Sequence, residues 1–246
     1  MRVPRTSPTP IAGEAIDEKA PAPGRRERAK AEKRARLIAA ARELFSLKGF
    51  AAATTSEIAE RADIGAGTLF LYVQSKEALL VQVFQEDMTR VRDEAFATLP
   101  PRATLLDELA HVYRAMSAFH ERDRGLARVY AKEVAFVPKP DRAVVEEFVE
   151  GLFELSDSRI EAAKVRGELA ADVPARALSQ NLFATFFLHL QQGLGMDAAL
   201  TSPERLAELR SLFALQLRGL AGPNADARTK APPSTRARRI AVKENA

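Results

Sequence analysis

Residues 54–73 carry the pattern that most restricts the fold of this chain: two short helical segments joined by a tight turn. Thr54 and Glu57 have the spacing of a capping box, in which a hydroxyl and a carboxylate satisfy the free N–H groups at a helix start. Apolar residues at helical spacing follow, and the small ones among them let a second helix cross closely. The turn falls at 63–65, and the segment 67–73 resumes the helix. This order predicts a helix-turn-helix.

The second segment has an unusual outward face. Leu69 and Val73, four residues apart, form its buried side. The residues left facing outward are Ala66, Gly67, Thr68, Leu71 and Tyr72. A seven-residue helix that exposes Leu and Tyr beside small residues gains no solubility from doing so. It suits a helix pressed against the bases and phosphates of a DNA groove.

Around this motif, Lys33 through Leu80 resembles the N-terminal DNA-binding domain of the TetR family of one-component transcriptional regulators. Three helices match in order and spacing, at 36–50, 54–59 and 67–80. The resemblance implies an all-α fold, in which a helical C-terminal domain binds a small-molecule effector and forms a homodimer. It also implies a cytoplasmic regulator without catalytic residues, cofactor or metal.

We expect the DNA contacts to come from the motif and from the start of the next helix. The candidates are Thr54, Thr55, Gly65, Ala66, Gly67, Thr68, Leu71, Tyr72 and Lys76. The two threonines and Lys76 are expected to anchor phosphates. Base reading is expected from Thr68, Leu71 and Tyr72, with Leu71 against a thymine methyl group. Ala66 and Gly67 allow the backbone to approach closely.

Four positions depart from the usual pattern of the family. Asp63 replaces a glycine and must adopt the left-handed turn conformation, which Asp tolerates. Gly65 is a weaker helix cap than the usual Ser. Ala66 and Phe70 replace a basic residue and a tyrosine, which removes two phosphate-binding groups. We expect affinity to depend more on the remaining contacts.

Charge and composition divide the chain into a basic start, an acidic body and a basic end. Residues 1–76 carry 14 Lys/Arg and 9 Asp/Glu, residues 77–222 carry 17 and 22, and residues 223–246 carry 6 and 2. We expect a disordered basic tail at 1–30, the helix-turn-helix domain at 31–80, a helical effector-binding and dimerisation domain at 81–222, and a second disordered basic tail at 223–246. A basic module on an acidic body is typical of a protein that presents one end to nucleic acid. No cysteine is present for a disulfide or thiolate metal site, and no signal peptide is recognisable.

In the body, helix-start residues and prolines mark where the predicted helices begin and end. They are expected at 75–98, 104–122, after Asp123, and at 141–167, 174–194 and 202–220.

Residues 177–196 lack any formal charge and have about the length of a membrane span, yet they include seven polar side chains that would be costly in hydrocarbon. We interpret 174–194 and 202–220 as a subunit interface, with Phe187 and Phe213 among its apolar residues. A two-fold dimer would place its recognition helices on half-sites roughly 34–36 Å apart.

The central helices are rich in methionine, histidine and aromatic residues: His111, Tyr113, Met116, Phe119, His120, Tyr130, Phe136, Phe148, Phe153, Phe187 and His189. Such residues at helical spacing belong to a core more often than to a cavity. The family resemblance implies a cavity among them for a small, often apolar effector, which Tyr113, Tyr130, His120 and His189 would orient. We expect the helix starting at Ser75 to transmit effector binding to the DNA-binding domain.

Two other classes of function compete with a repressor that an effector releases from a palindromic operator. Glu108 and His111 have the spacing used by di-iron carboxylate bundles, but such a site needs two Glu-x-x-His pairs and this chain has one. A non-specific architectural DNA-binding protein would use the basic tails and prefer no sequence. The sequence favours the regulator, without distinguishing repression from activation.

Overall fold

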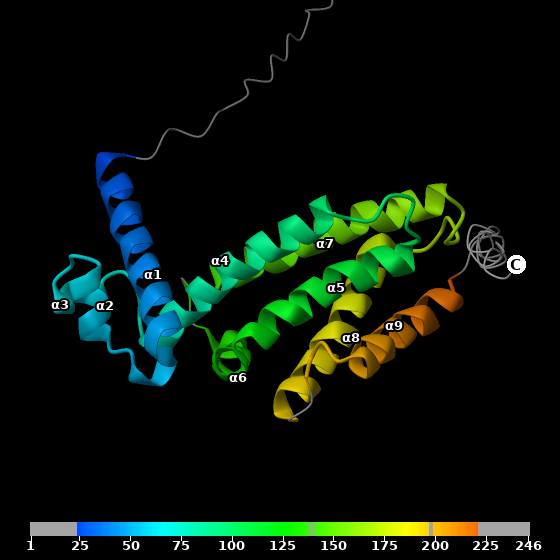
Figure 1. The fold of residues 1–246 in the computed structure, drawn as a ribbon. Helices are drawn as coiled ribbons and strands as arrows, with labels where there is room; N and C mark the ends of the chain where they lie inside the picture. The colour runs from blue at the N-terminus through cyan, green and yellow to red at the C-terminus, as the bar shows by residue number, and fades with distance from the viewer. Residues whose placement is uncertain (1–23, 138, 140, 197–198, 221–246) are drawn as a thin grey trace, which may run out of the picture.

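The computed structural model describes residues 24–137, 139, 141–196 and 199–220, which form helices, turns and loops without regular strands (Figure 1). The all-α prediction is confirmed. The helices are α1 (Arg25–Ala52), α2 (Thr55–Arg61), α3 (Ala66–Leu69), α4 (Lys76–Ala97), α5 (Leu105–Arg122), α6 (Arg124–Glu133), the 3-10 helix η1 (Val134–Phe136), α7 (Ala143–Val165), α8 (Ala175–Gly195) and α9 (Pro203–Arg218).

The helices surround two hydrophobic cores that meet on α4. Helices α1–α3 and the first turns of α4 enclose a small core around Phe45, Ile58 and Leu79; we call this part the head. Helices α4–α9 enclose a larger core that includes Tyr113 and Phe186; we call this part the body. Figure 1 shows the head at one end of α4, which then runs along the body. Because one helix belongs to both cores, a movement of α4 in the body is also a movement of the head.

Side-chain caps explain where five of these helices begin. Thr54, Ser75, Thr104, Asp123 and Ser202 each accept a hydrogen bond from a backbone N–H in the first turn of the helix that follows. These bonds satisfy donors that have no partner inside the helix. The helix starts predicted at these five residues are confirmed.

The first helix begins earlier than the sequence predicted. Residues 25–30, which the sequence analysis assigned to a disordered tail, are helical. The backbone N–H of Gly24 donates to Glu27 Oε2 at 3.1 Å, so an acidic side chain stabilises the new start. The other residues assigned to the tails, 1–23 and 223–246, lie outside the described residues.

A buried polar cluster ties the head to the loop before α7. Asp141 Oδ1 accepts from Gln82 Nε2 at 2.6 Å and from Arg34 Nη2 at 3.3 Å, and Gln82 Oε1 accepts from Arg34 Nε at 3.0 Å. Burial raises the pKa of the Asp141 carboxyl group, and the Arg34 guanidinium opposes that effect. A second contact joins Gln74 Nε2 to the carbonyl oxygen of Lys139 at 2.8 Å. Helices α1 and α4 and this loop therefore hold each other in place.

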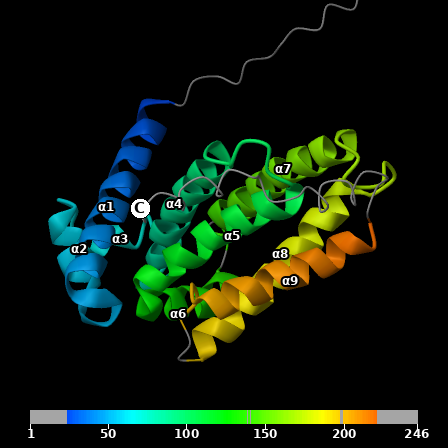
Figure 2. The ribbon, with the colours of Figure 1, turned by 45° about the vertical axis from the view of Figure 1, so that its right-hand side comes forward.

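The last two helices pack together at the edge of the body (Figure 2). Phe213 is fully buried within the chain, with its ring centroid 5.1 Å from that of Tyr113. Its assignment to a subunit interface is therefore wrong: Phe213 faces α5. Phe187 is 39% exposed, and the other large apolar side chains exposed on α8 and α9 are Leu188, Leu212 and Leu215.

Candidate nucleic-acid interface

The helix-turn-helix starts at a capping box that has the predicted geometry. The backbone N–H of Thr54 donates to Glu57 Oε2 at 2.9 Å, and the backbone N–H of Glu57 donates to Thr54 Oγ1 at 3.3 Å. Contacts with Lys48 and Thr54 lower the pKa of Glu57 to about 2. The Thr54 hydroxyl also donates its proton to Glu57 Oε2, at 2.7 Å. A phosphate contact from this hydroxyl, as predicted, would require that proton to turn away from Glu57.

The turn between α2 and α3 depends on Asp63. Its φ of 54° lies in the left-handed region, where the sequence analysis expected it. Arg36 Nη1 lies 3.2 Å from Asp63 Oδ2, which connects the turn to α1. Helix α3 then contains only Ala66–Leu69, and turns follow it. The predicted seven-residue helix over 67–73 is therefore too long.

Despite the shorter helix, the two faces of the segment are as predicted. Leu69 and Val73 are buried, at 0% and 2% exposure, and they anchor the segment in the head core. Leu71 is 74% exposed. The remaining candidates in this segment are exposed (Gly65, Ala66 and Gly67) or half-buried (Thr68 and Tyr72).

One exposed residue of this segment is not among the predicted DNA contacts. Phe70 is 56% exposed and follows directly after α3. In the sequence pattern it stands out only as a replacement for tyrosine. The signal that indicates its exposure is its position next to the buried Leu69, because adjacent helical residues point in directions about 100° apart.

Lys76 is engaged inside the head. Its ammonium donates to the carbonyl oxygens of Phe50 and Ala53, at 2.9 and 3.0 Å, and it lies 4.3 Å from the centre of the Phe50 ring. These carbonyls belong to the end of α1, where backbone acceptors lack helical partners. An ammonium group has three protons, so one is left for a phosphate. The phosphate role of Lys76 stays a prediction, alongside a structural role that the sequence did not indicate.

The body places an aromatic cluster beside α4. The Phe84 and Tyr130 rings are stacked with centroids 4.0 Å apart, and Phe119 and His120 pack against Phe84. His120 Nδ1 lies 2.7 Å from the Met116 carbonyl oxygen, and burial lowers the pKa of His120 to about 4. His120 is therefore a neutral member of the core near neutral pH. Among the other predicted effector-region residues, Phe136 lies outside the core, at 81% exposure.

A hollow of about 510 Å³ lies between α4 and α7, next to this cluster. Gln85, Arg92 and Phe148 are among its lining residues. Gln85 is 2% exposed; its Nε2 lies 2.8 Å from the Tyr130 hydroxyl oxygen, and its Oε1 has no partner among the described residues. A buried amide atom without a partner costs free energy that a bound hydrogen-bond donor would recover.

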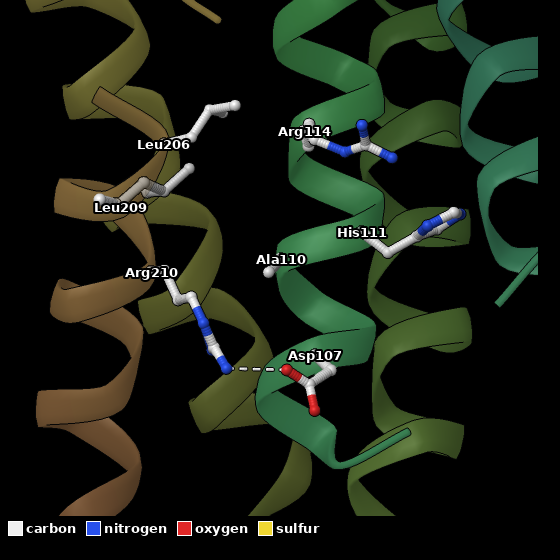
Figure 3. Close-up of a pocket in the computed structure, with 8 residues that line it drawn as sticks. Asp107, Ala110, His111, Arg114, Leu206, Leu209 and Arg210 are labelled. Atoms are coloured by element: carbon white, nitrogen blue, oxygen red, sulfur yellow. Dashed lines mark hydrogen bonds and ion pairs between the residues drawn. The ribbon is translucent and has the colours of Figure 1, made fainter. Parts of the chain in front are cut away.

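The geometry does not assemble the competing metal site. Glu108 is bound through both carboxylate oxygens to Arg159, at 2.6 and 2.8 Å, whereas His111 Nε2 lies 3.2 Å from Thr98 Oγ1. Figure 3 shows His111 pointing away from Asp107 and Arg210, which form an ion pair at 2.8 Å across the hollow between α5 and α9. No group of three or more metal-ligating side chains occurs in the described part of the chain. The Glu-x-x-His spacing is therefore not a metal site: Glu108 is buried and ion-paired with Arg159, and His111 is half-buried on the same helix.

Comparison with known proteins decides the class of this domain. Residues 37–83 match the family described as "Bacterial regulatory proteins, tetR family". The chain therefore contains a DNA-binding domain of the TetR family. It is 26% identical over 149 residues to the fatty acid metabolism regulator protein of Bacillus subtilis (strain 168), a match that covers 61% of this chain and 77% of the relative.

Solved structures of TetR-family regulators have the same fold. The crystal structure of Thermus thermophilus FadR, a TetR-family repressor in complex with lauroyl-CoA, is similar with a TM-score of 0.56 and 25% identity, over 75% of this chain and 93% of that one. FadR from Bacillus halodurans gives a TM-score of 0.57 and 23% identity, over 76% and 98%. The protein is thus a DNA-binding transcriptional regulator, and its relatives are regulators rather than enzymes. Of the helices that the structure describes, α8 included, none is long and apolar enough to cross a membrane.

Proposed function

We propose that this TetR-family protein is a repressor that binds a palindromic operator as a homodimer and releases it when a small, largely apolar effector binds. The observation that carries the proposal is the exposed face of the helix-turn-helix. Leu71 stands out from the surface beside Gly67 and Thr68, while Leu69 and Val73 lock the segment into the head core. A rigid backbone that presents a leucine and small residues suits close approach to base edges in the major groove.

The homodimer would form through the outer faces of α8 and α9. Phe187 and Leu188 of α8 and Leu212 and Leu215 of α9 are exposed in the single chain, at 37–63%. Helices α8 and α9 pack against each other, and apolar side chains exposed on such a pair of helices favour a protein–protein contact. A two-fold dimer is also what DNA recognition needs, because one short recognition segment reads too few base pairs to select an operator.

The chemical class of effector to test first is a fatty acyl-CoA. Two relatives support it: the fatty acid metabolism regulator of B. subtilis, and T. thermophilus FadR with its lauroyl-CoA. The hollow between α4 and α7 offers a place beside the aromatic cluster where an apolar chain would meet Phe148.

Helix α4 would carry the response from this hollow to the DNA. Gln85 lines the hollow, and Gln82 lies about one helical turn earlier on α4. Gln82 donates a hydrogen bond to Asp141 and accepts one from Arg34 of α1. A shift of α4 would move the head and change the distance between the two recognition segments. The effector must bind one arrangement more tightly than the other, because equal affinity for both shifts no equilibrium.

The test is selection of bound duplexes from a random DNA pool, followed by affinity measurements on the selected sequence with acyl-CoAs of increasing chain length. We expect a palindrome, and weaker binding with an acyl-CoA than with free CoA as the control. A selection without any preferred sequence would contradict the proposal and favour an architectural DNA-binding protein. If the protein selects a palindrome, and an acyl-CoA raises the melting temperature of the protein without changing its affinity for that palindrome, only the effector part of the proposal is contradicted.

A further inference from the structure

The helix-turn-helix of this protein presents very little positive charge to DNA. Residues 54–73 contain three acidic residues and one basic residue, Arg61. Arg61 is already paired with Glu43 of α1. DNA affinity depends strongly on cations that neutralise phosphates. The motif therefore needs positive charge from another part of the molecule.

Most other cations of the head are also occupied. Arg34, Arg36, Arg42 and Lys48 pair with acidic side chains, at 2.5–3.3 Å for their shortest contacts. The head's free cations lie elsewhere, on the first turns of α1. Residues 24–33 contain five basic and two acidic residues, all of them exposed. Among the described residues, Arg26, Lys30 and Lys33 have no hydrogen-bond or ion-pair partner.

These turns stand beside the recognition segment. A hollow of about 400 Å³ is lined by Arg26, Lys30 and Lys33 of α1 on one side and by Leu71 and Tyr72 on the other. The three cations recur at intervals of three and four residues, so they share one side of the helix. In Figures 1 and 2 the N-terminal turns of α1 extend beyond the other helices. The body therefore does not cover the surface that they present.

We propose that the N-terminal turns of α1 are a second DNA-binding element, in which Arg26, Lys30 and Lys33 hold the sugar-phosphate strand beside the groove that Leu71 and Tyr72 enter. This inference rests on the proposed function, because it takes Leu71 and Tyr72 as the surface that faces DNA. It assigns the phosphate-binding role mainly to α1, because Ala66 carries no charge and the one basic residue of the helix-turn-helix, Arg61, is paired with Glu43. Phosphate contacts set affinity and orientation but carry no sequence information, so this element adds binding strength without changing the base preference.

The experiment compares two double variants that remove the same charge from the same helix. Lys30→Ala/Lys33→Ala removes cations that line the hollow, and Arg25→Ala/Arg28→Ala removes exposed cations that do not line it. Affinity for the selected operator duplex is measured across a salt series. With about 0.9 counterions released per phosphate, the Lys30/Lys33 variant should lower the slope of log affinity against log salt by about 2. The Arg25/Arg28 variant should leave the slope near the wild-type value.

Two controls distinguish a failure of the α1 element from a failure of operator binding. Melting temperatures should stay at the wild-type value for both variants, because all four side chains are exposed, and the selected DNA motif should be unchanged. Equal slopes for the Lys30/Lys33 variant and wild type, or equal losses in both variants, would overturn the second element while leaving operator binding intact. A wild-type protein that selects no sequence at all would instead overturn the proposed function.

Discussion

Two phenylalanines on neighbouring helices should affect different equilibria when they are shortened. Phe187 of α8 is 39% exposed, and in the proposed dimer that exposed part becomes buried. With about 200 Å² for a phenylalanine side chain, this is about 80 Å², or about 2 kcal/mol at ~25 cal/mol per Å². Two-fold symmetry buries the residue twice, so Phe187→Ala should cost dimerisation up to about 4 kcal/mol. That corresponds to roughly a thousandfold weaker association.

Phe213→Ala should behave differently, because its ring is fully buried inside one chain. It should lower the free energy of unfolding by about 3–5 kcal/mol, as deletion of a core aromatic ring does. Sedimentation equilibrium measures the first effect, and thermal or urea unfolding the second. Leu47→Ala is the matched control for Phe187, since Leu47 is 71% exposed but lies in the head. A Phe187→Ala dimer as tight as wild type, or a wild-type monomer at micromolar concentration, would refute the reasoning.

Three further predictions concern the core and the DNA surface. His120 should cost the wild type about 2 kcal/mol of folding stability between about pH 7 and about pH 5, because the unfolded chain protonates it near 6.5 whereas burial lowers its folded pKa to about 4. In urea titrations at the two pH values, His120→Phe should lack this contribution. Leu71→Ala should relax base preference at one position per half-site in a DNA selection, with the melting temperature unchanged. Lys76→Ala should lower the melting temperature, by removing two bonds to carbonyls of α1, and reduce the salt slope by about 1.

Each of these predictions has an outcome that contradicts it. For the pH effect, His111→Gln is the control on the same helix, because its imidazole is only half-buried; a wild-type pH dependence in His120→Phe would exclude the buried imidazole as the cause. An unaltered DNA motif in Leu71→Ala would mean that this leucine faces solvent rather than bases. If Lys76→Ala melts earlier but retains the full salt slope, Lys76 caps α1 and does not bind phosphate.

Helix starts were predictable because each depends on a few neighbouring residues. A side chain such as Thr54, Ser75 or Ser202 reaches only the backbone of the turn that follows it, so the sequence nearby contains the whole interaction. The same holds for Asp63, whose short polar side chain tolerates the left-handed turn. The buried pair Leu69 and Val73 also followed from helical spacing.

Features that depend on distant partners were not predictable. Spacing places Leu69 and Val73 on one side whether α3 has four residues or seven, so its length is decided by packing in the head. No local pattern indicates that the Lys76 ammonium binds carbonyls 23 and 26 residues away. The start of α1 was missed for the opposite reason. Its first turns bury nothing, so no apolar repeat marks them as a helix.

The sequence by itself determined the helical class, the helix starts and the family of the DNA-binding domain, because periodicity, capping and turn conformation act within one or two helical turns. Tertiary structure alone decided that Phe213 belongs to the core while Phe187 faces outward. It also decided that Arg61 is paired, whereas Lys30 lines an open hollow beside the recognition segment. Burial and charge pairing depend on how helices far apart in the chain cross. Two residues of the same type on similar helices can therefore have different roles.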